Sequence, residues 1–153
     1  MKALWRISNH SDLAGLGGER ADGRWHSASR GKRIVYLSEH PALALVEVLA
    51  NLKGNPRLFP ESYQLMRVEV PEAISSGTVE VESLAAGWRE EVHATRAVGD
   101  AWLEAGESAL LWVPSAVAPE SWNVLVNALH PEARLVTIAW TRRVAYDKRL
   151  FHL

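Results

Sequence analysis

The sequence predicts an α+β protein with a largely antiparallel or mixed sheet. Several short runs are rich in β-branched and aromatic residues, fewer stretches have helical spacing, and the two kinds do not alternate regularly. The length of 153 residues suits one domain. The 48% of hydrophobic and 23% of charged residues are typical of a folded globular protein. Because repeats, low-complexity tracts and linkers are absent from the sequence, we expect a single domain over residues 1–153.

Apolar and alternating runs predict the strands. We expect them at 3–7, 33–37, 63–70, 78–81, 109–113, 122–126 and 135–140, with 144–146 extending the last. Helical spacing predicts two helices, at 42–53 with Pro41 in its first turn and Gly54 as its stop, and at 90–105 closed by Gly106. Residues 15–31 are rich in glycine without apolar periodicity, which predicts a long loop of the kind that often carries function.

Charge and composition argue against several classes of protein. Seventeen Lys and Arg stand against 18 Asp and Glu, without the basic excess that binding to nucleic acid or anionic membranes usually needs. No run approaches the ~20 apolar residues of a membrane-spanning helix, and the first ten residues lack the apolar stretch of a signal peptide. We therefore expect a cytoplasmic protein that contacts neither nucleic acid nor membrane. The lack of cysteine excludes disulfides, thiolate zinc sites and a cysteine nucleophile.

One acidic residue interrupts the first predicted helix. Between Ala42 and Ala50 every residue except Glu47 is apolar, and these apolar side chains point almost all the way around the helix. A carboxylate in such a buried helix must be paired, hydrogen-bonded or protonated. Glu47 either shares a narrow solvent-facing stripe with Asn51 or stands in a pocket wall. There it would orient a polar substrate group or stabilise developing positive charge.

Three further residues are candidates for chemistry. Arg24 lies in the glycine-rich loop, where it is either solvated or able to bind a phosphate with its bidentate fork. Tyr36 lies in an aliphatic strand just before the helix that carries Glu47. It is either a core residue with a satisfied hydroxyl or part of a cleft at the strand–helix junction. Ser115 follows a strand end, where serines commonly close turns.

Motifs for other chemistries are missing from the sequence. The six histidines form neither an H-E-x-x-H motif nor a pair at helical spacing, so we expect no metal site. The glycine-rich loop lacks the Walker spacing of a nucleoside-triphosphate site. No G-x-S-x-G motif surrounds Ser115, which argues against a serine hydrolase.

Taken together, these residues resemble the RES-domain family, named for its Arg, Glu and Ser. The matching stretches follow the family's order over most of the chain, at 23–27, 34–39, 42–49, 113–117 and 123–127, then His130-Pro131. The chain departs from the family's pattern at Asp22, where a second glycine often precedes the arginine motif, and at Ala128, which stands where a proline often follows the second asparagine. Neither departure touches the four candidate residues.

The resemblance implies the toxin of a bacterial toxin–antitoxin pair with a fold similar to ADP-ribosyltransferases. It implies that NAD is the substrate, that no prosthetic group is held, and that the nicotinamide–ribose bond is cleaved by hydrolysis or phosphorolysis. One alternative is an ADP-ribosyltransferase that modifies a protein, and another is a non-catalytic module that binds a nucleotide or a partner. The implied partner is an Xre-type helix-turn-helix antitoxin that covers the active site.

The hypothesis gives each candidate residue a role. Arg24 binds the pyrophosphate or nearby anionic oxygens, and Tyr36 stacks on the nicotinamide or shapes its pocket. Glu47 hydrogen-bonds the ribose hydroxyls and stabilises the oxocarbenium-like cation, while Ser115 positions the nicotinamide ribose or amide. Because nicotinamide leaves as a neutral molecule, one carboxylate suffices without a strong general acid or a metal. The sequence assigns no role to His26, Asn123, Asn127 and His130.

Overall fold

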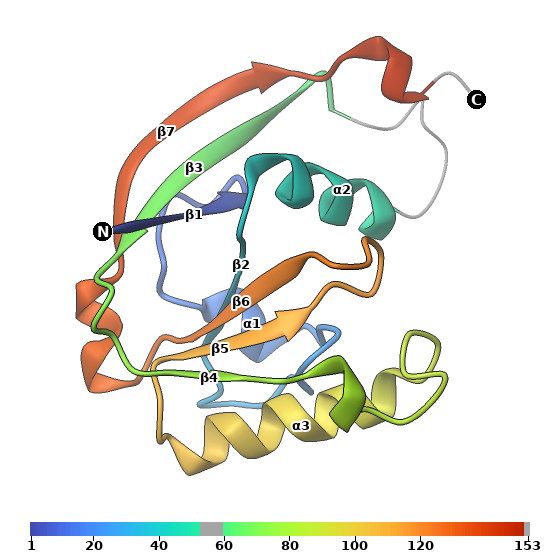
Figure 1. Cartoon of the computed structure of the whole chain (residues 1–153). Coiled ribbons are helices and arrows are strands. Elements are labelled where there is room, and N and C mark those ends of the chain that lie inside the picture. The colour runs from blue at the N-terminus through green and yellow to red at the C-terminus, as the bar shows by residue number, and fades with distance from the viewer. Residues whose placement is uncertain (53–59, 152–153) are drawn as a thin grey trace.

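The computed structural model describes residues 1–52 and 60–151, and within them seven strands form one sheet in the order β4-β5-β6-β2-β1-β3-β7 (Figure 1). The strands are β1 (Lys2–Ile7), β2 (Ile34–Ser38), β3 (Ser62–Val70), β4 (Ser76–Thr78), β5 (Leu110–Pro114), β6 (Trp122–Asn127) and β7 (Thr137–Ala145). β4 and β5 are parallel, and the other neighbouring strands are antiparallel. The predicted α+β class with a mixed sheet is confirmed.

Three α-helices accompany the sheet in the described residues: α1 (Leu16–Arg20), α2 (Pro41–Asn51) and α3 (Val92–Ala105). α2 begins after His40, whose Nδ1 accepts a hydrogen bond from the backbone N–H of Ala42 at 3.0 Å. α2 ends at Asn51, two residues before the expected end at residue 53, and the expected stop, Gly54, lies outside the described residues. α3 ends as predicted at Gly106, which takes the left-handed conformation with φ 63°.

No described helix is both long and apolar enough to cross a membrane.

Three predicted segments differ in detail. The glycine-rich segment 15–31 contains α1, whose five residues are too few and too rich in glycine for a periodic pattern.

The strand expected at 78–81 is β4 at 76–78, followed by a 3₁₀ helix at Val81–Ser83. The two pieces expected at 135–140 and 144–146 are one strand, β7, preceded by a 3₁₀ helix at Pro131–Leu135. β7 is an edge strand with little burial, so its apolar alternation is weak.

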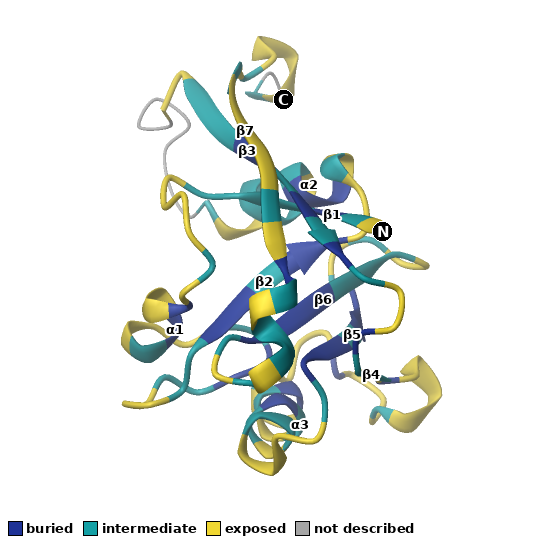
Figure 2. Ribbon diagram, turned by 90° about the vertical axis from the view of Figure 1, so that its left-hand side faces the viewer, coloured by how far each residue is buried: buried dark blue, intermediate teal, exposed yellow. Residues whose placement is uncertain are grey.

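The sheet is buried on both faces along its central strands. Successive residues of β2 alternate between two apolar clusters: Val35 and Leu37 join one, while Ile34 joins the other. Figure 2 shows the buried residues concentrated on β2, β5 and β6, with β7 largely exposed. α2 packs against β1 and β2. The helix that carries Glu47 is thereby fixed beside the strand that carries Tyr36.

Candidate active site

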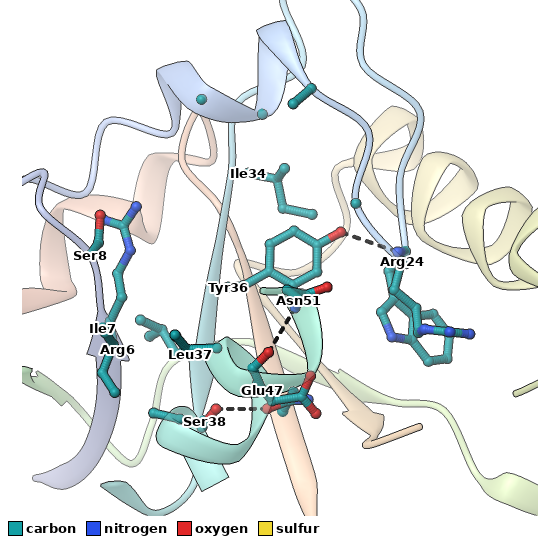
Figure 3. Close-up of a pocket in the computed structure, with 18 of the residues that line it drawn as sticks. Arg6, Ile7, Ser8, Arg24, Ile34, Tyr36, Leu37, Ser38, Glu47 and Asn51 are labelled. Atoms are coloured by element: carbon teal, nitrogen blue, oxygen red, sulfur yellow. Dashed lines mark hydrogen bonds between the residues drawn. The ribbon is translucent and has the colours of Figure 1, made fainter. Parts of the chain in front are cut away.

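A cavity of about 730 Å³ lies between the end of β1, the glycine-rich loop, β2 and α2 (Figure 3). Its size is within the range of small-molecule and cofactor sites. Arg24, Tyr36 and Glu47 all line it, although they come from the loop, the sheet and a helix. The structure therefore brings three of the four predicted residues to one hollow.

Arg24 is held by its backbone and keeps its side chain nearly uncommitted. The hydroxyl of Thr95 donates to the Arg24 carbonyl at 2.5 Å, and Nε of Arg96 donates to the Gly23 carbonyl at 2.8 Å. The Arg24 guanidinium makes one long contact, from Nη1 to the Trp88 carbonyl at 3.5 Å. In the described part of the chain no carboxylate pairs with it. A half-buried guanidinium of this kind retains donors for an anion.

The Tyr36 hydroxyl belongs to a chain of hydrogen bonds inside the protein. It accepts from the backbone N–H of Trp25 at 3.1 Å and lies 2.8 Å from Nδ1 of His26, whose Nε2 lies 2.9 Å from the Gly18 carbonyl. Because a carbonyl only accepts, Nε2 carries the proton, and in the neutral ring Nδ1 accepts from the Tyr36 hydroxyl. Burial raises the pKa of Tyr36, which keeps this hydroxyl a donor. Tyr36 thus has a satisfied hydroxyl and still lines the cavity.

Glu47 stands in the cavity wall. Its Oε1 accepts from Oγ of Ser115 at 2.6 Å and from Nδ2 of Asn123 at 2.9 Å. Asn51 donates to the backbone carbonyl of Glu47 at 2.8 Å rather than to its carboxylate. Glu47 is half-buried and hydrogen-bonded, as the pocket interpretation expects, and does not share an open solvent stripe with Asn51.

Ser115 lies behind Glu47 rather than in the cavity. It is 1% exposed and is not one of the described residues that line the hollow. Its Oγ accepts from the backbone N–H groups of Val117 and Ala118 at 3.2 and 3.0 Å, which closes the turn after β5. The hydroxyl can donate one hydrogen bond, and it donates it to Oε1 of Glu47. In this structure the Ser115 hydroxyl orients Glu47, and its expected contact with the nicotinamide ribose or amide stays a prediction.

Arg6 is a cavity residue that the sequence reasoning missed. Its Nη1 donates to the Asp12 carbonyl at 2.5 Å, and burial lowers the pKa of the guanidinium while the charge of Asp12 raises it. Figure 3 shows Arg6 and Arg24 on opposite sides of Tyr36. The available signal was an arginine inside the apolar run 3–7. Two guanidiniums at one cavity suit a ligand with more than one anionic group.

Asn127 and His130 lie away from this cavity and have local roles. Oδ1 of Asn127 accepts from the backbone N–H of Leu129 at 3.2 Å, and Nδ1 of His130 accepts from the backbone N–H of Glu132 at 3.1 Å. Both side chains therefore cap turns after β6. Within residues 1–52 and 60–151, no group of three or more His, Asp or Glu side chains is arranged to hold a metal.

The fold and the site define a small α+β protein with an Arg–Tyr–Glu cavity, and comparison with known proteins identifies its class. Residues 3–148 match the RES domain, so the chain belongs to the RES-domain family. The "Toxin Res" of Pseudomonas putida KT2440 is 39% identical, over 97% of this chain and 99% of the relative. The "Prs ADP-ribosylating toxin" of Sphingobium sp. strain YBL2 is 33% identical, over 97% of this chain and 96% of the relative.

A solved structure shows the same fold. The match is to the crystal structure of the Mycobacterium tuberculosis MbcT–MbcA toxin–antitoxin complex, with a TM-score of 0.67 and 19% sequence identity. It covers 99% of this chain and 87% of the matched chain. The agreement over nearly the whole chain confirms the fold class, and at this identity it concerns the fold alone.

Proposed function

We propose that this protein is the toxin of a toxin–antitoxin pair and that it cleaves the nicotinamide–ribose bond of NAD by hydrolysis or phosphorolysis. The observation that carries the proposal is the cavity, in which two guanidiniums and one oriented carboxylate share a hollow of about 730 Å³. NAD offers two phosphates for the guanidiniums and a ribose for the carboxylate. The toxin names of the relatives in Pseudomonas and Sphingobium support the biological setting.

The reaction needs little acid–base help from the protein. When the bond between the ribose C1′ and the nicotinamide nitrogen breaks, its electron pair returns to the cationic ring, which leaves neutral. The positive charge moves to the ribose as an oxocarbenium-like centre. An oxygen of water or phosphate then bonds to C1′, and water releases its proton to solvent. A fixed carboxylate near C1′ accelerates this step by stabilising the developing charge.

Each of the cavity residues has a proposed role in binding NAD or in stabilising the cationic centre. Arg24 and Arg6 bind the pyrophosphate from two sides, and the ring of Tyr36 packs on the nicotinamide end. Glu47 hydrogen-bonds the ribose hydroxyls and faces the cationic centre. Ser115 contributes through Glu47, because its hydroxyl already donates its hydrogen bond to Oε1.

Release of nicotinamide from NAD by the purified protein tests the proposal. Glu47→Gln and Arg24→Ala should each lower kcat/KM at least about tenfold, which corresponds to about 1.4 kcal/mol in the barrier. Glu104→Gln and Arg134→Ala make the same chemical changes at exposed positions outside the cavity and should keep the parent's rate. Parental rates in both cavity variants would refute the assigned roles.

Transfer of ADP-ribose to a protein is the second candidate, and the name of the Sphingobium relative favours it. Hydrolysis, phosphorolysis and transfer share the site and differ in the acceptor. Free ADP-ribose, ADP-ribose 1″-phosphate or a labelled protein in the products distinguishes the three reactions. A protein that binds NAD without releasing nicotinamide would instead be a binding module.

We further propose an antitoxin partner of the Xre type that covers the cavity. The support is that the structural neighbour was crystallised as a toxin–antitoxin complex. Expression of the chain alone should lower cellular NAD and stop growth, and co-expression of the partner should restore both. Unchanged NAD in expressing cells would contradict the proposed activity.

A further inference from the structure

The hydrogen bonds of the Glu47 carboxylate all end on one of its two oxygens. Ser115 and Asn123 both donate to Oε1. Among residues 1–52 and 60–151 no hydrogen bond reaches Oε2. Each carboxylate oxygen has about two lone-pair sites, so the two donors use the capacity of Oε1. Oε2 is the oxygen that remains for a substrate hydroxyl.

Asn123 can donate to Glu47 only while its amide nitrogen faces the carboxylate. At the other end of the amide, the Ser38 hydroxyl donates to Oδ1 of Asn123 at 2.7 Å. In the flipped amide Oδ1 would face Oε1, so two acceptors would oppose each other and the hydrogen bond to Glu47 would be lost. The hydroxyl of Ser38 therefore favours the orientation that serves Glu47.

The sheet fixes the two ends of this arrangement. Ser38 is the last residue of β2 and is paired directly with Asn123 of β6. Ser38 is 5% exposed, so water has little access to compete for its proton. Neither residue depends on a loop for its place. A glutamate side chain, by contrast, has several rotatable bonds, and its freedom must be restrained if the carboxylate is to keep one orientation.

We propose that Asn123 is a positioning residue for Glu47 and that Ser38 acts through Asn123. The three residues form the Ser38–Asn123–Glu47 relay, which runs from β2 through β6 to α2 and directs Oε2 into the cavity. The inference rests on the proposed function in one respect, that the group meeting Oε2 is a ribose hydroxyl of NAD. Loss of the relay lets the carboxylate leave its aligned position, so the rate of the chemical step falls more than the affinity for NAD.

A double-mutant cycle on nicotinamide release tests the order of action. Asn123→Ala should lower kcat about tenfold with KM within about twofold, and Ser38→Ala should lower kcat about threefold. The double variant should be no slower than Asn123→Ala, because Ser38 acts on Glu47 only through Asn123. If the two residues acted independently, their effects on kcat would multiply to a loss of about thirtyfold in the double variant. That result would overturn the proposal.

A matched control separates positioning from folding. Asn127→Ala makes the same exchange on the same strand, where it removes only the cap on Leu129. It should lower the melting temperature about as much as Asn123→Ala while keeping the parent's kcat. Ser38→Thr retains the hydroxyl and should recover most of the rate that Ser38→Ala loses. An equal loss of kcat in Asn127→Ala would reduce the effect to general destabilisation and would overturn the proposal.

The relay can also be measured without turnover. In the ¹⁵N-labelled protein, the side-chain amide protons of Asn123 should differ strongly in chemical shift, because one is bonded to a carboxylate. Ser38→Ala and Glu47→Ala should each move them toward the values of a free asparagine. Free values in the parent protein would overturn the relay. A bonded amide in a protein that releases no nicotinamide would leave the relay standing and refute the proposed function.

Discussion

The cavity has two walls that are held in different ways. In the loop wall, formed by residues 15–31, side chains of β2 and α3 bind backbone groups, and the Arg24 guanidinium stays nearly free. In the Glu47 wall, side chains of β2, of β6 and of the turn after β5 fix the carboxylate that α2 carries. The difference fits the proposed roles of Arg24 in binding an anion and of Glu47 in stabilising positive charge. An arginine that binds an anion can adapt to its ligand, whereas a carboxylate that stabilises charge must be preorganised.

Because the two walls are held differently, we expect changes that affect the loop wall to act on stability and on NAD binding. Changes in the Glu47 wall should act mainly on rate. Three variants of residues that contact the loop wall from β2 and α3, taken from the largest expected effect to the smallest, test this.

Gly99→Ala should have the largest effect. Gly99 of α3 is where the loop crosses the helix, and a Cβ there would lie 1.6 Å from the Trp25 carbonyl oxygen. Because that oxygen belongs to backbone, the whole loop must shift, and we expect a loss of about 3 kcal/mol in unfolding free energy. NAD cleavage should fall with it, since Arg24 precedes the displaced residue. Chemical denaturation and nicotinamide release measure the two effects.

Gly17→Ala is the matched control for Gly99→Ala. Gly17 is also helical, but a Cβ there meets nothing within 4 Å. Alanine is the better helix former, so the unfolding free energy should stay equal or rise by about 0.5–1 kcal/mol. Equal stability in the two variants would mean that the loop does not pack on α3.

Tyr36→Phe should have an intermediate effect. The change leaves the buried N–H of Trp25 and Nδ1 of His26 without their shared partner, which costs about 1–3 kcal/mol in unfolding free energy. The ring that faces the cavity is kept. We expect KM for NAD to rise more than kcat falls, because the displaced loop carries Arg24. Tyr63→Phe on β3, outside the cavity, should change neither constant. A selective loss of kcat in Tyr36→Phe would instead assign the hydroxyl to the chemistry.

The sequence could identify residues that break a local pattern. Glu47 stands out because its helix is otherwise apolar, and the structure shows that one side of that helix faces a cavity. Arg24 and Tyr36 stand out from their immediate neighbours in the same way. The strands of the central sheet were predictable for a related reason, since burial on both faces produces continuous β-branched runs.

The sequence could not show contacts that depend on how elements meet. Ser115 lies behind Glu47 because β5, β6 and α2 converge there, and no local pattern records this. Arg6 resembles any polar strand residue. It lines the cavity because β1 and β2 are joined at one register pair, Trp5 with Ser38, and diverge beyond it.

Asp100→Asn should have the smallest effect and should depend on pH. Burial raises the pKa of Asp100, but hydrogen bonds from the Ser27 N–H and from Lys32 outweigh this and lower it overall. A carboxyl whose pKa is lowered by folding stabilises the protein above its unfolded value of about 3.9, and this stability is lost as pH falls through the folded value.

We therefore expect Asp100→Asn to cost about 1 kcal/mol at pH 7, because the partly exposed charged hydrogen bonds tie the loop to α3. The gap between parent and variant should close as pH falls below about 4. Asp147→Asn is the control, since Asp147 pairs with Arg149 two residues away and both are exposed, so it joins no two elements. Urea unfolding of the parent and both variants across this pH range measures the gap. A gap that widens in acid would show that the Asp100 carboxylate does not hold the loop wall.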